Sequence, residues 1–335
     1  MGFTLEQLVI FYTQTLPQHL PHFDPGMHKT GDIVRAVIIP TTAVDGCAYA
    51  TKMMKGVATQ PIVMVTHNWS NLFRDLVAAV IADAIEENTY SHISYFLENN
   101  HVGLHKLLTT KALRKTYWIC AFSVNQHKSI CGVNRRHIKD PTTGIEYSVC
   151  SCAQPKIFNT TPPVRSDGKS IQCQMNKFDD MMSYLASRNQ SFSQLVAVDQ
   201  TFDLFNRAWC VAELAEADKR GMKQRLIIHS RKALASVPEQ LHSLKIQDMQ
   251  AARPEDIQEI LAKIPDVDAF NSSLQKKLFG TGGLLDLWQV ADALEQAVTI
   301  ARMTRIGRVF ATIPKSFLEE SAQEELSRES SFVSI

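Results

Sequence analysis

The sequence predicts an α/β protein with a mostly parallel, doubly wound sheet. The first observation is a set of short apolar runs, rich in β-branched or aromatic residues, that have the length of buried strands. The second is that segments with helical spacing follow or separate these runs, and this alternation favours a parallel sheet. The third is that the first three runs each lead into a polar stretch. The predicted strands are Ile62–Val65, Trp118–Phe122, Leu195–Val198 and Leu226–Ile228.

Helices are predicted where apolar residues recur every three or four positions. Residues 5–12 have this spacing and predict a short amphipathic helix, and residues 72–85 and 208–215 predict two helices of the α/β core. The sequence Arg-Pro-Glu-Asp at 253–256 is typical of a helix start, because proline fits the first turn and acids lie near the positive end of the helix dipole. Another helix is predicted over 284–303.

The same patterns divide the chain into regions. We expect an N-terminal extension over residues 1–60, an α/β core over 61–230 and a C-terminal helical region over 231–318. The tail, 319–335, is rich in Ser and Glu and is expected to be disordered. Residues 128–176 interrupt the core with four prolines and several glycines, which indicates a long insertion.

Charge and hydropathy exclude some classes of partner. The chain of 335 residues has 35 Lys+Arg against 34 Asp+Glu, so its formal net charge is +1 and it carries no electrostatic footprint for nucleic acid or an anionic membrane. No apolar run approaches the ~20 residues that span a bilayer. The N-terminus has no cationic region ahead of its apolar residues, so it does not predict a signal peptide. We expect a cytoplasmic protein.

Polar and aromatic side chains follow the predicted strands at the ends where ligands of doubly wound sheets bind. One such cluster would be ordinary loop chemistry, but three at equivalent positions indicate a site. The candidates after the three strands are, in order, His67, Asn68 and Trp69; Ser123, Asn125 and Gln126; and Asp199.

The helix after the third of these strands carries the central candidate, Glu213. Trp209 lies four residues before it and Cys210 three, so all share one helical face. A carboxylate beside an indole near the start of a helix can be held close to a bound ring. The alternative is that Glu213 is a solvated residue that forms ion pairs with Lys219 or Arg220.

Three sequence blocks carry a resemblance to a known family. Val198–Phe202 followed by Arg207–Leu214, which contains Trp-Cys-Val-Ala-Glu-Leu, resembles the signature of Toll/interleukin-receptor (TIR) domains of plants and their enzymatic relatives. Together with Val65–Trp69 and Tyr117–His127, it is most similar to TIR-like proteins of algae and other protists. The resemblance covers roughly residues 60–230 and implies a flavodoxin-like core, in which the insertion takes the approximate place of a familiar TIR loop.

The resemblance also implies a chemistry. In enzymatic TIR domains the glutamate of this string is needed to split NAD between nicotinamide and ribose, which implies a nucleotide substrate and a catalytic Glu213. A nearby carboxylate stabilises the oxocarbenium-like ribosyl centre that this cleavage creates. Candidates to orient the ribose or the attacking water are Asp199, Asn125 and His67, and candidates for an aromatic platform are Trp69 and Trp209.

Two other functions remain open on the sequence alone. One is a non-catalytic TIR-like module that binds partners, and the other is an enzyme resembling nucleoside deoxyribosyltransferases, which also place a carboxylate at an anomeric carbon. Because TIR enzymes commonly need oligomers to complete the site, the resemblance implies a homo-oligomer.

The insertion contains a candidate metal site. Its thiols are as numerous as those that a structural Zn²⁺ takes, although the Cys-x-Cys pair departs from the usual Cys-x-x-Cys spacing. His127 or His137 could replace one thiolate, and unlinked thiols or a disulfide are the alternatives. The candidate ligands are Cys131, Cys150, Cys152 and Cys173.

Overall fold

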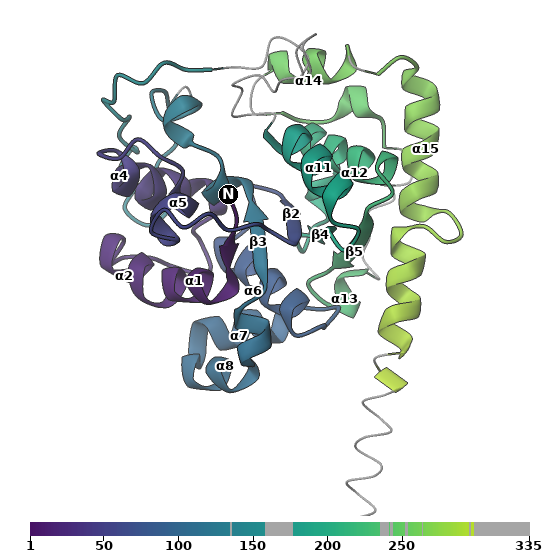
Figure 1. Cartoon of the computed structure of the whole chain (residues 1–335), viewed down its shortest axis with the longest axis horizontal. Coiled ribbons are helices and arrows are strands. Elements are labelled where there is room, and N and C mark those ends of the chain that lie inside the picture. The colour runs from purple at the N-terminus through teal and green to yellow at the C-terminus, as the bar shows by residue number, and fades with distance from the viewer. Residues whose placement is uncertain are drawn as a thin grey trace, which may run out of the picture. The chain divides into compact units, whose positions relative to one another are not determined.

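The computed structural model shows an α/β protein whose mostly parallel sheet is flanked by helices (Figure 1). Residues Met1–Trp288 form one compact unit and Gln289–Ile335 a second. The described residues are 1–134, 136–157, 177–234, 241, 244–251, 254–262, 264–294 and 296–297.

The sheet has five strands in the order β1-β3-β2-β4-β5. β1 pairs with β3 in the antiparallel sense, and all other pairs are parallel. The four strands predicted from the sequence are present, displaced by a few residues, and a fifth lies at the N-terminal edge. The strands are β1 Phe3–Thr4, β2 Val63–His67, β3 Thr116–Ile119, β4 Ser193–Ala197 and β5 Lys223–Ile227.

The second predicted strand, Trp118–Phe122, is too long at its C-terminal end. It was expected to include Cys120–Phe122, but β3 ends at Ile119 and the chain turns into the short helix α10, Cys120–Ser123. Ala121 and Phe122 are fully buried in this helical turn. A short apolar run indicates burial in a strand and in a helix equally well, which explains the error.

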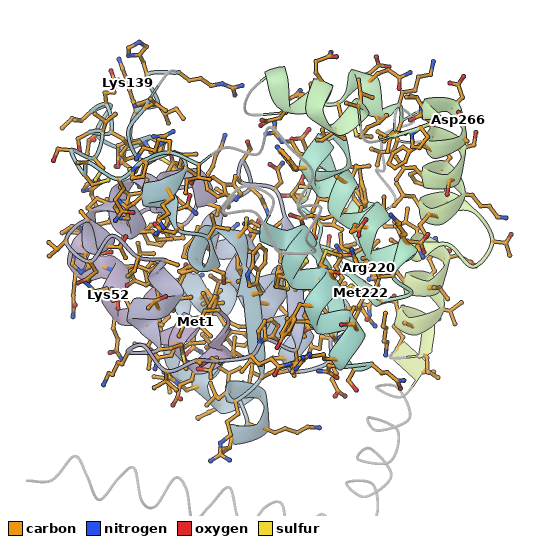
Figure 2. All side chains as sticks on the ribbon, turned by 45° about the horizontal axis from the view of Figure 1, so that its top comes forward. Met1, Lys52, Lys139, Arg220, Met222 and Asp266 are labelled. Carbon is orange, nitrogen blue, oxygen red and sulfur yellow. The ribbon has the colours of Figure 1, made fainter. Side chains whose placement is uncertain are left out.

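Successive residues of a strand point to opposite faces of the sheet. Because the strands carry apolar residues on both faces, helices cover both. Val65 in β2 packs in a core with α1 (Leu5–Ile10) and α6 (Phe73–Ala84). Val196 in β4 packs in a second core with α12 (Ala208–Lys219). Side chains fill the space between helices and sheet on each side (Figure 2).

The N-terminal segment belongs to the larger core. Phe3 lies in the edge strand, and its ring centroid is 5.3 Å from that of Phe122. Phe11 lies 5.1 Å from Phe122 and 5.8 Å from Phe73. These edge-to-face and tilted contacts join the N-terminal helices to α6 and α10. Residues 1–60 are therefore integrated into the sheet and its covering layer.

The predicted helices at 72–85 and 208–215 correspond to α6 and α12, and the start predicted at 253–256 corresponds to α14. Residues 284–294 are also helical, and the remainder of that prediction, like the tail at 319–335, falls outside the described residues. The other α-helices are α2 Leu16–His19, α3 Thr30–Ile33, α4 Ile39–Thr42, α5 Tyr49–Met53, α7 Ser91–Asn99, α8 His101–Leu107, α9 Thr110–Leu113, α11 Lys177–Arg188, α13 Arg231–Leu234, α14 Pro254–Leu261 and α15 Val267–Phe279.

Short helical turns of other types connect several of these elements. Phe11–Thr15 and Val34–Ile38 are π-helical turns that continue neighbouring α-helices. Gln126–Lys128 (η3), Asp203–Asn206 (η4) and Ile246–Asp248 are single 3₁₀ turns. Within the described part of the chain, none of the helices combines the length and apolar character needed to cross a membrane.

Candidate functional site

A pocket that encloses about 200 Å³ lies beyond the carboxyl ends of β2 and β3. The strand order reverses between β2 and β4, because the chain runs from β2 outward to β3 and then returns to the other side of β2. Crevices at such switch points are where open α/β sheets bind ligands. His67, Asn68 and Trp69, which follow β2 as predicted, line the pocket.

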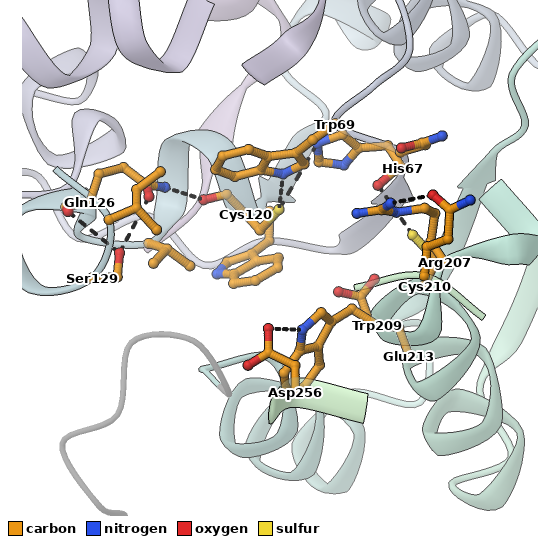
Figure 3. Close-up of a pocket in the computed structure, with 15 residues that line it drawn as sticks. His67, Trp69, Cys120, Gln126, Ser129, Arg207, Trp209, Cys210, Glu213 and Asp256 are labelled. Carbon is orange, nitrogen blue, oxygen red and sulfur yellow. Dashed lines mark hydrogen bonds between the residues drawn. The ribbon is translucent and has the colours of Figure 1, made fainter. Parts of the chain in front are cut away.

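The helix α12 forms one side of the pocket. Arg207, Trp209, Cys210 and Glu213 come from its first turns and line the pocket together. Figure 3 shows Glu213 and Trp209 facing the Trp69 and Cys120 side chains across the space. The helical spacing that predicted a common face for Trp209, Cys210 and Glu213 is confirmed.

The Glu213 carboxylate is the end of a row of hydrogen bonds that crosses the sheet. Thr66 Oγ1 donates to Glu213 Oε2 at 2.5 Å. Gln194 Nε2 donates to Thr66 Oγ1 at 2.7 Å, and Gln224 Nε2 donates to Gln194 Oε1 at 2.8 Å. Thr66 and Gln194 are 0% and 1% exposed. Since Thr66 Oγ1 already accepts a bond from Gln194, its own proton points at the carboxylate.

Three indoles line the same pocket as this carboxylate. Trp69 Nε1 donates to Cys120 Sγ at 3.1 Å, and Trp209 Nε1 donates to Asp256 Oδ2 at 3.1 Å. Trp118, in β3, is 2% exposed and lines the pocket from beneath the strand end. Both tryptophans predicted as aromatic platforms thus lie in the pocket with their ring nitrogens bonded, which leaves their faces for packing.

Three ionisable side chains that line the pocket, His67, Cys120 and Cys210, are uncharged near neutral pH. Burial lowers the pKa of His67 to about 4. Burial, together with the nearby charge of Glu213, raises the pKa of Cys120 to about 12 and that of Cys210 well above its usual value. The imidazole and both thiols therefore present neutral polar surfaces to a ligand.

Arg207 brings a positive charge to the pocket. Its Nη1 donates to Gln250 Oε1 at 3.3 Å, and Gln250 also lines the pocket. The backbone of the same segment fixes the start of α12, because Ala208 N donates to Gln250 O at 3.0 Å. A guanidinium at this position can pair with a phosphate or a carboxylate of a ligand.

The structure brings most of the predicted ligand-binding residues into one place. His67, Asn68, Trp69, Gln126, Trp209, Cys210 and Glu213 all line the pocket. Asp199, Ser123 and Asn125 are not among the lining residues.

The contacts of Asp199 are those of a residue that organises its own loop. Its Oδ1 accepts from Asp203 N at 2.9 Å and its Oδ2 from Leu204 N at 2.7 Å, so the carboxylate caps η4. Asn125 acts similarly, with its Oδ1 accepting from His127 N at 3.0 Å. Ser123 is buried, and its hydroxyl has no hydrogen-bond partner among the described residues.

Several site residues were missed by sequence reasoning. Thr66 directly follows the first predicted strand, and Gln194 and Gln224 precede the third and fourth, so all three lay just outside the apolar runs. Arg207 lay in the motif that carried the resemblance but was given no role. Asp256 was interpreted only as part of a helix start, whereas its carboxylate also holds Trp209.

The insertion brings four metal-ligating side chains together next to this pocket. His127 offers a ring nitrogen and Cys131, Cys150 and Cys152 offer sulfurs, and all four atoms lie within 4.8 Å of one another. These residues could hold a metal ion such as zinc. The predicted fourth thiolate, Cys173, lies outside the described residues. His137 is exposed and pairs instead with Glu146 at 3.0 Å.

A second group, His22, His28 and Asp140, also has its ligand atoms within 4.8 Å of one another. Both histidines lie in hydrogen-bond contact with one carboxylate oxygen, at 3.0 Å and 3.2 Å. Burial opposes ionisation of Asp140, but bonds from Thr142, Thr143 and His22 outweigh it and hold the pKa of this carboxyl well below its usual range. The contacts of this group form a hydrogen-bonded cluster that ties the insertion to the loop between α2 and α3.

Comparisons with protein-family models, with curated proteins and with solved structures find no match to this chain.

Proposed function

We propose that the pocket binds the nicotinamide–ribose end of NAD and that Glu213 promotes cleavage of the bond between them. The observation that carries the proposal is the place of Glu213: a carboxylate held by Thr66 at 2.5 Å, beside Trp209, in a pocket at the switch point of a parallel sheet. Leaving β1 aside, the order β3-β2-β4-β5 corresponds to that of flavodoxin-like sheets, which supports a TIR-like core.

The proposed reaction breaks the bond between the ribose anomeric carbon and the pyridinium nitrogen. The bonding electron pair leaves with nicotinamide and neutralises its positive charge, and the anomeric carbon becomes an oxocarbenium-like centre. The Glu213 carboxylate stabilises that centre electrostatically. Water then adds to the carbon and loses a proton, which gives ADP-ribose; attack by a nitrogen of the adenine instead gives a cyclic product.

The other lining groups have matching roles in this proposal. Trp69 and Trp209 offer flat apolar faces for the nicotinamide ring, and Arg207 offers a cation for the pyrophosphate. His67, neutral because of its burial, can bond a ribose hydroxyl without repelling the pyridinium. The enclosed 200 Å³ is smaller than the roughly 300 Å³ at which ligand pockets usually begin, so the adenosine half would extend beyond the pocket.

The test is release of nicotinamide from NAD by the full chain, measured over a wide range of protein concentration. The range matters because the TIR resemblance implies a homo-oligomer. Glu213→Gln keeps the size of the side chain and an acceptor for Thr66 but removes the charge, and it should slow release about 10³-fold. Glu216→Gln is the matched control, because Glu216 lies on the same helix but pairs with Arg220 and does not line the pocket.

Each other outcome has a defined meaning. Full activity in Glu213→Gln would refute the catalytic role of this carboxylate. Release of a base from deoxynucleosides, with none from NAD, would assign the pocket to deoxyribosyl transfer. No release from either substrate at any concentration would favour a non-catalytic interaction module.

A further inference from the structure

We propose that His127, Cys131, Cys150 and Cys152 bind one Zn²⁺ ion in a closed tetrahedral site that fixes the loop wall of the pocket. This zinc site does not depend on the proposed NAD chemistry.

Three separations between the ligand atoms are close to the edges of a zinc tetrahedron, and all four atoms lie within 4.8 Å of one another. Cys131 Sγ and Cys152 Sγ are 3.5 Å apart, and His127 Nδ1 lies 3.6 Å from the sulfurs of both Cys150 and Cys152. With Zn–S bonds of about 2.3 Å and a Zn–N bond of about 2.0–2.1 Å, tetrahedral geometry gives edges of about 3.8 Å between sulfurs and about 3.5 Å from sulfur to nitrogen. Four protein ligands leave no open position, which is the arrangement of structural zinc sites.

The ring of His127 is oriented for a metal at Nδ1. Thr42 Oγ1 donates to Ile38 O at 2.6 Å, so it is available as an acceptor for His127 Nε2, which lies 2.9 Å away. The proton of the neutral ring is therefore on Nε2, and the lone pair of Nδ1 faces the three sulfurs. Metal-bound histidines are held in this way by a partner on their other nitrogen.

Lys156 supplies the charge that such a site lacks. Three thiolates and Zn²⁺ together carry one net negative charge, and a partly buried anion needs a nearby cation. Lys156 Nζ donates to Cys131 Sγ at 2.9 Å and to His127 O at 2.6 Å. The Cys150 sulfur also accepts from Cys152 N at 3.4 Å.

A disulfide accounts for less of this arrangement. A bond between Cys131 and Cys152 would use two sulfurs. It would not explain why the third sulfur, the imidazole of His127 and the ammonium of Lys156 lie beside them. The six cysteines in the described residues are free thiols.

The loop from 124 to 131 connects this site to the pocket. Val124, Gln126, Ser129 and Ile130 line the pocket, and His127 and Cys131 lie between and after them in the same stretch. The stretch has only the single 3₁₀ turn η3 as regular structure. A metal that clamps two of its residues to Cys150 and Cys152 therefore sets the position of this wall.

The first test is zinc content of the purified full chain, measured by elemental analysis. We expect about one zinc per chain. Cys152→Ser and His127→Ala should lose it, whereas Cys47→Ser, which removes a free thiol outside the cluster, should keep it. Cys173→Ser separates this ligand set from the one predicted from the sequence: zinc should persist in this variant.

A metal-free wild type with all thiols reduced would overturn the proposal, and so would loss of zinc in Cys173→Ser with retention in His127→Ala. If the ligand variants do not fold, the wild type still decides, because Co²⁺ exchanged into it should show the intense visible absorption of tetrahedral thiolate coordination. An octahedral Co²⁺ spectrum would refute the site.

The effect on the pocket wall has its own readout. Chelation should raise amide exchange across residues 124–131 while exchange in α12 stays unchanged. Equal protection of the loop with and without metal would refute its role as a clamp.

Discussion

The two sides of the pocket are built in different ways. One side is the α12 wall, the first turns of a regular helix whose start is fixed by Ala208 N bonding to Gln250 O and whose buried face packs on the sheet through Val211 and Leu214. The other is the loop wall, residues 124–131, which has a single 3₁₀ turn and is held by turn hydrogen bonds, by side chains and by the cluster of His127 with three sulfurs.

The difference shows where each wall obtains its rigidity. In the α12 wall, backbone bonds and apolar burial position Glu213, so its geometry depends on the stability of the whole core. In the loop wall, the backbone bonds are local turn bonds such as Cys131 N to Gln126 O at 3.1 Å, and side-chain bonds such as His127 N to Asn125 Oδ1 at 3.0 Å add to them. The proposed zinc site would replace regular structure as the source of order in that wall.

The largest expected effect is a difference in the free energy of unfolding that is lost when a side chain of each wall is truncated. Leu214→Ala in the α12 wall removes a 1% exposed side chain and should lower the free energy of unfolding by about 2–5 kcal/mol. Ile130→Ala in the loop wall removes a half-buried one and should cost about 1 kcal/mol. Urea denaturation of the two variants checks this, and equal losses would contradict the distinction.

A smaller effect is expected from pH, at the point where the walls meet. His67 Nε2 faces the neutral thiol of Cys120 at 4.0 Å, so protonation would place a charge on a buried ring beside an uncharged group. Burial lowers the pKa of His67 from 6.5 to about 4, so the unfolded chain binds the proton first as the pH falls. Stability is complete above pH 6.5 and should fall by about 2 kcal/mol by pH 5.

Denaturation curves at pH 7 and pH 5 measure this loss. In His67→Gln, which cannot titrate, the part of the loss that comes from this ring should disappear. An identical pH dependence in the variant and the wild type would show that other groups cause it.

The smallest effect concerns the loop wall alone. Lys156→Gln removes the cation beside Cys131 but leaves all four ligands, so zinc should still bind with an affinity reduced about 10-fold or more. Competition with a chromophoric chelator measures the change. Lys128→Gln is the control, because Lys128 is a neighbouring cation without a hydrogen bond to the sulfurs among the described residues; a similar drop there would indicate a general charge effect.

Sequence periodicity predicted the elements of the core well, because strand and helix spacing are local properties. It also placed Glu213, Trp209 and Cys210 on one face, since positions three and four apart on a helix are neighbours whatever the fold. The alternation of strands and helices predicted a parallel sheet, whereas the strand order β3-β2-β4 comes from the structure.

The features that the sequence did not predict depend on pairing across the sheet or on loop geometry. Thr66 meets Gln194 only because β2 and β4 are neighbours in one register, which no local pattern encodes. Asp199 occupies an expected position, yet nearby amide groups take up its carboxylate. The sequence left His127 and His137 open as alternatives to a thiolate, and only the folded loop shows that His127 lies beside Cys150 and Cys152.

The row from Gln224 through Gln194 and Thr66 to Glu213 has a chemical direction. Every member gives its hydrogen to the next, and Thr66 has its proton already committed to Oε2. A proton that Glu213 acquired in the proposed reaction could not pass back along this row. Because the row only donates toward the carboxylate, Glu213 would exchange that proton by a route outside these three residues.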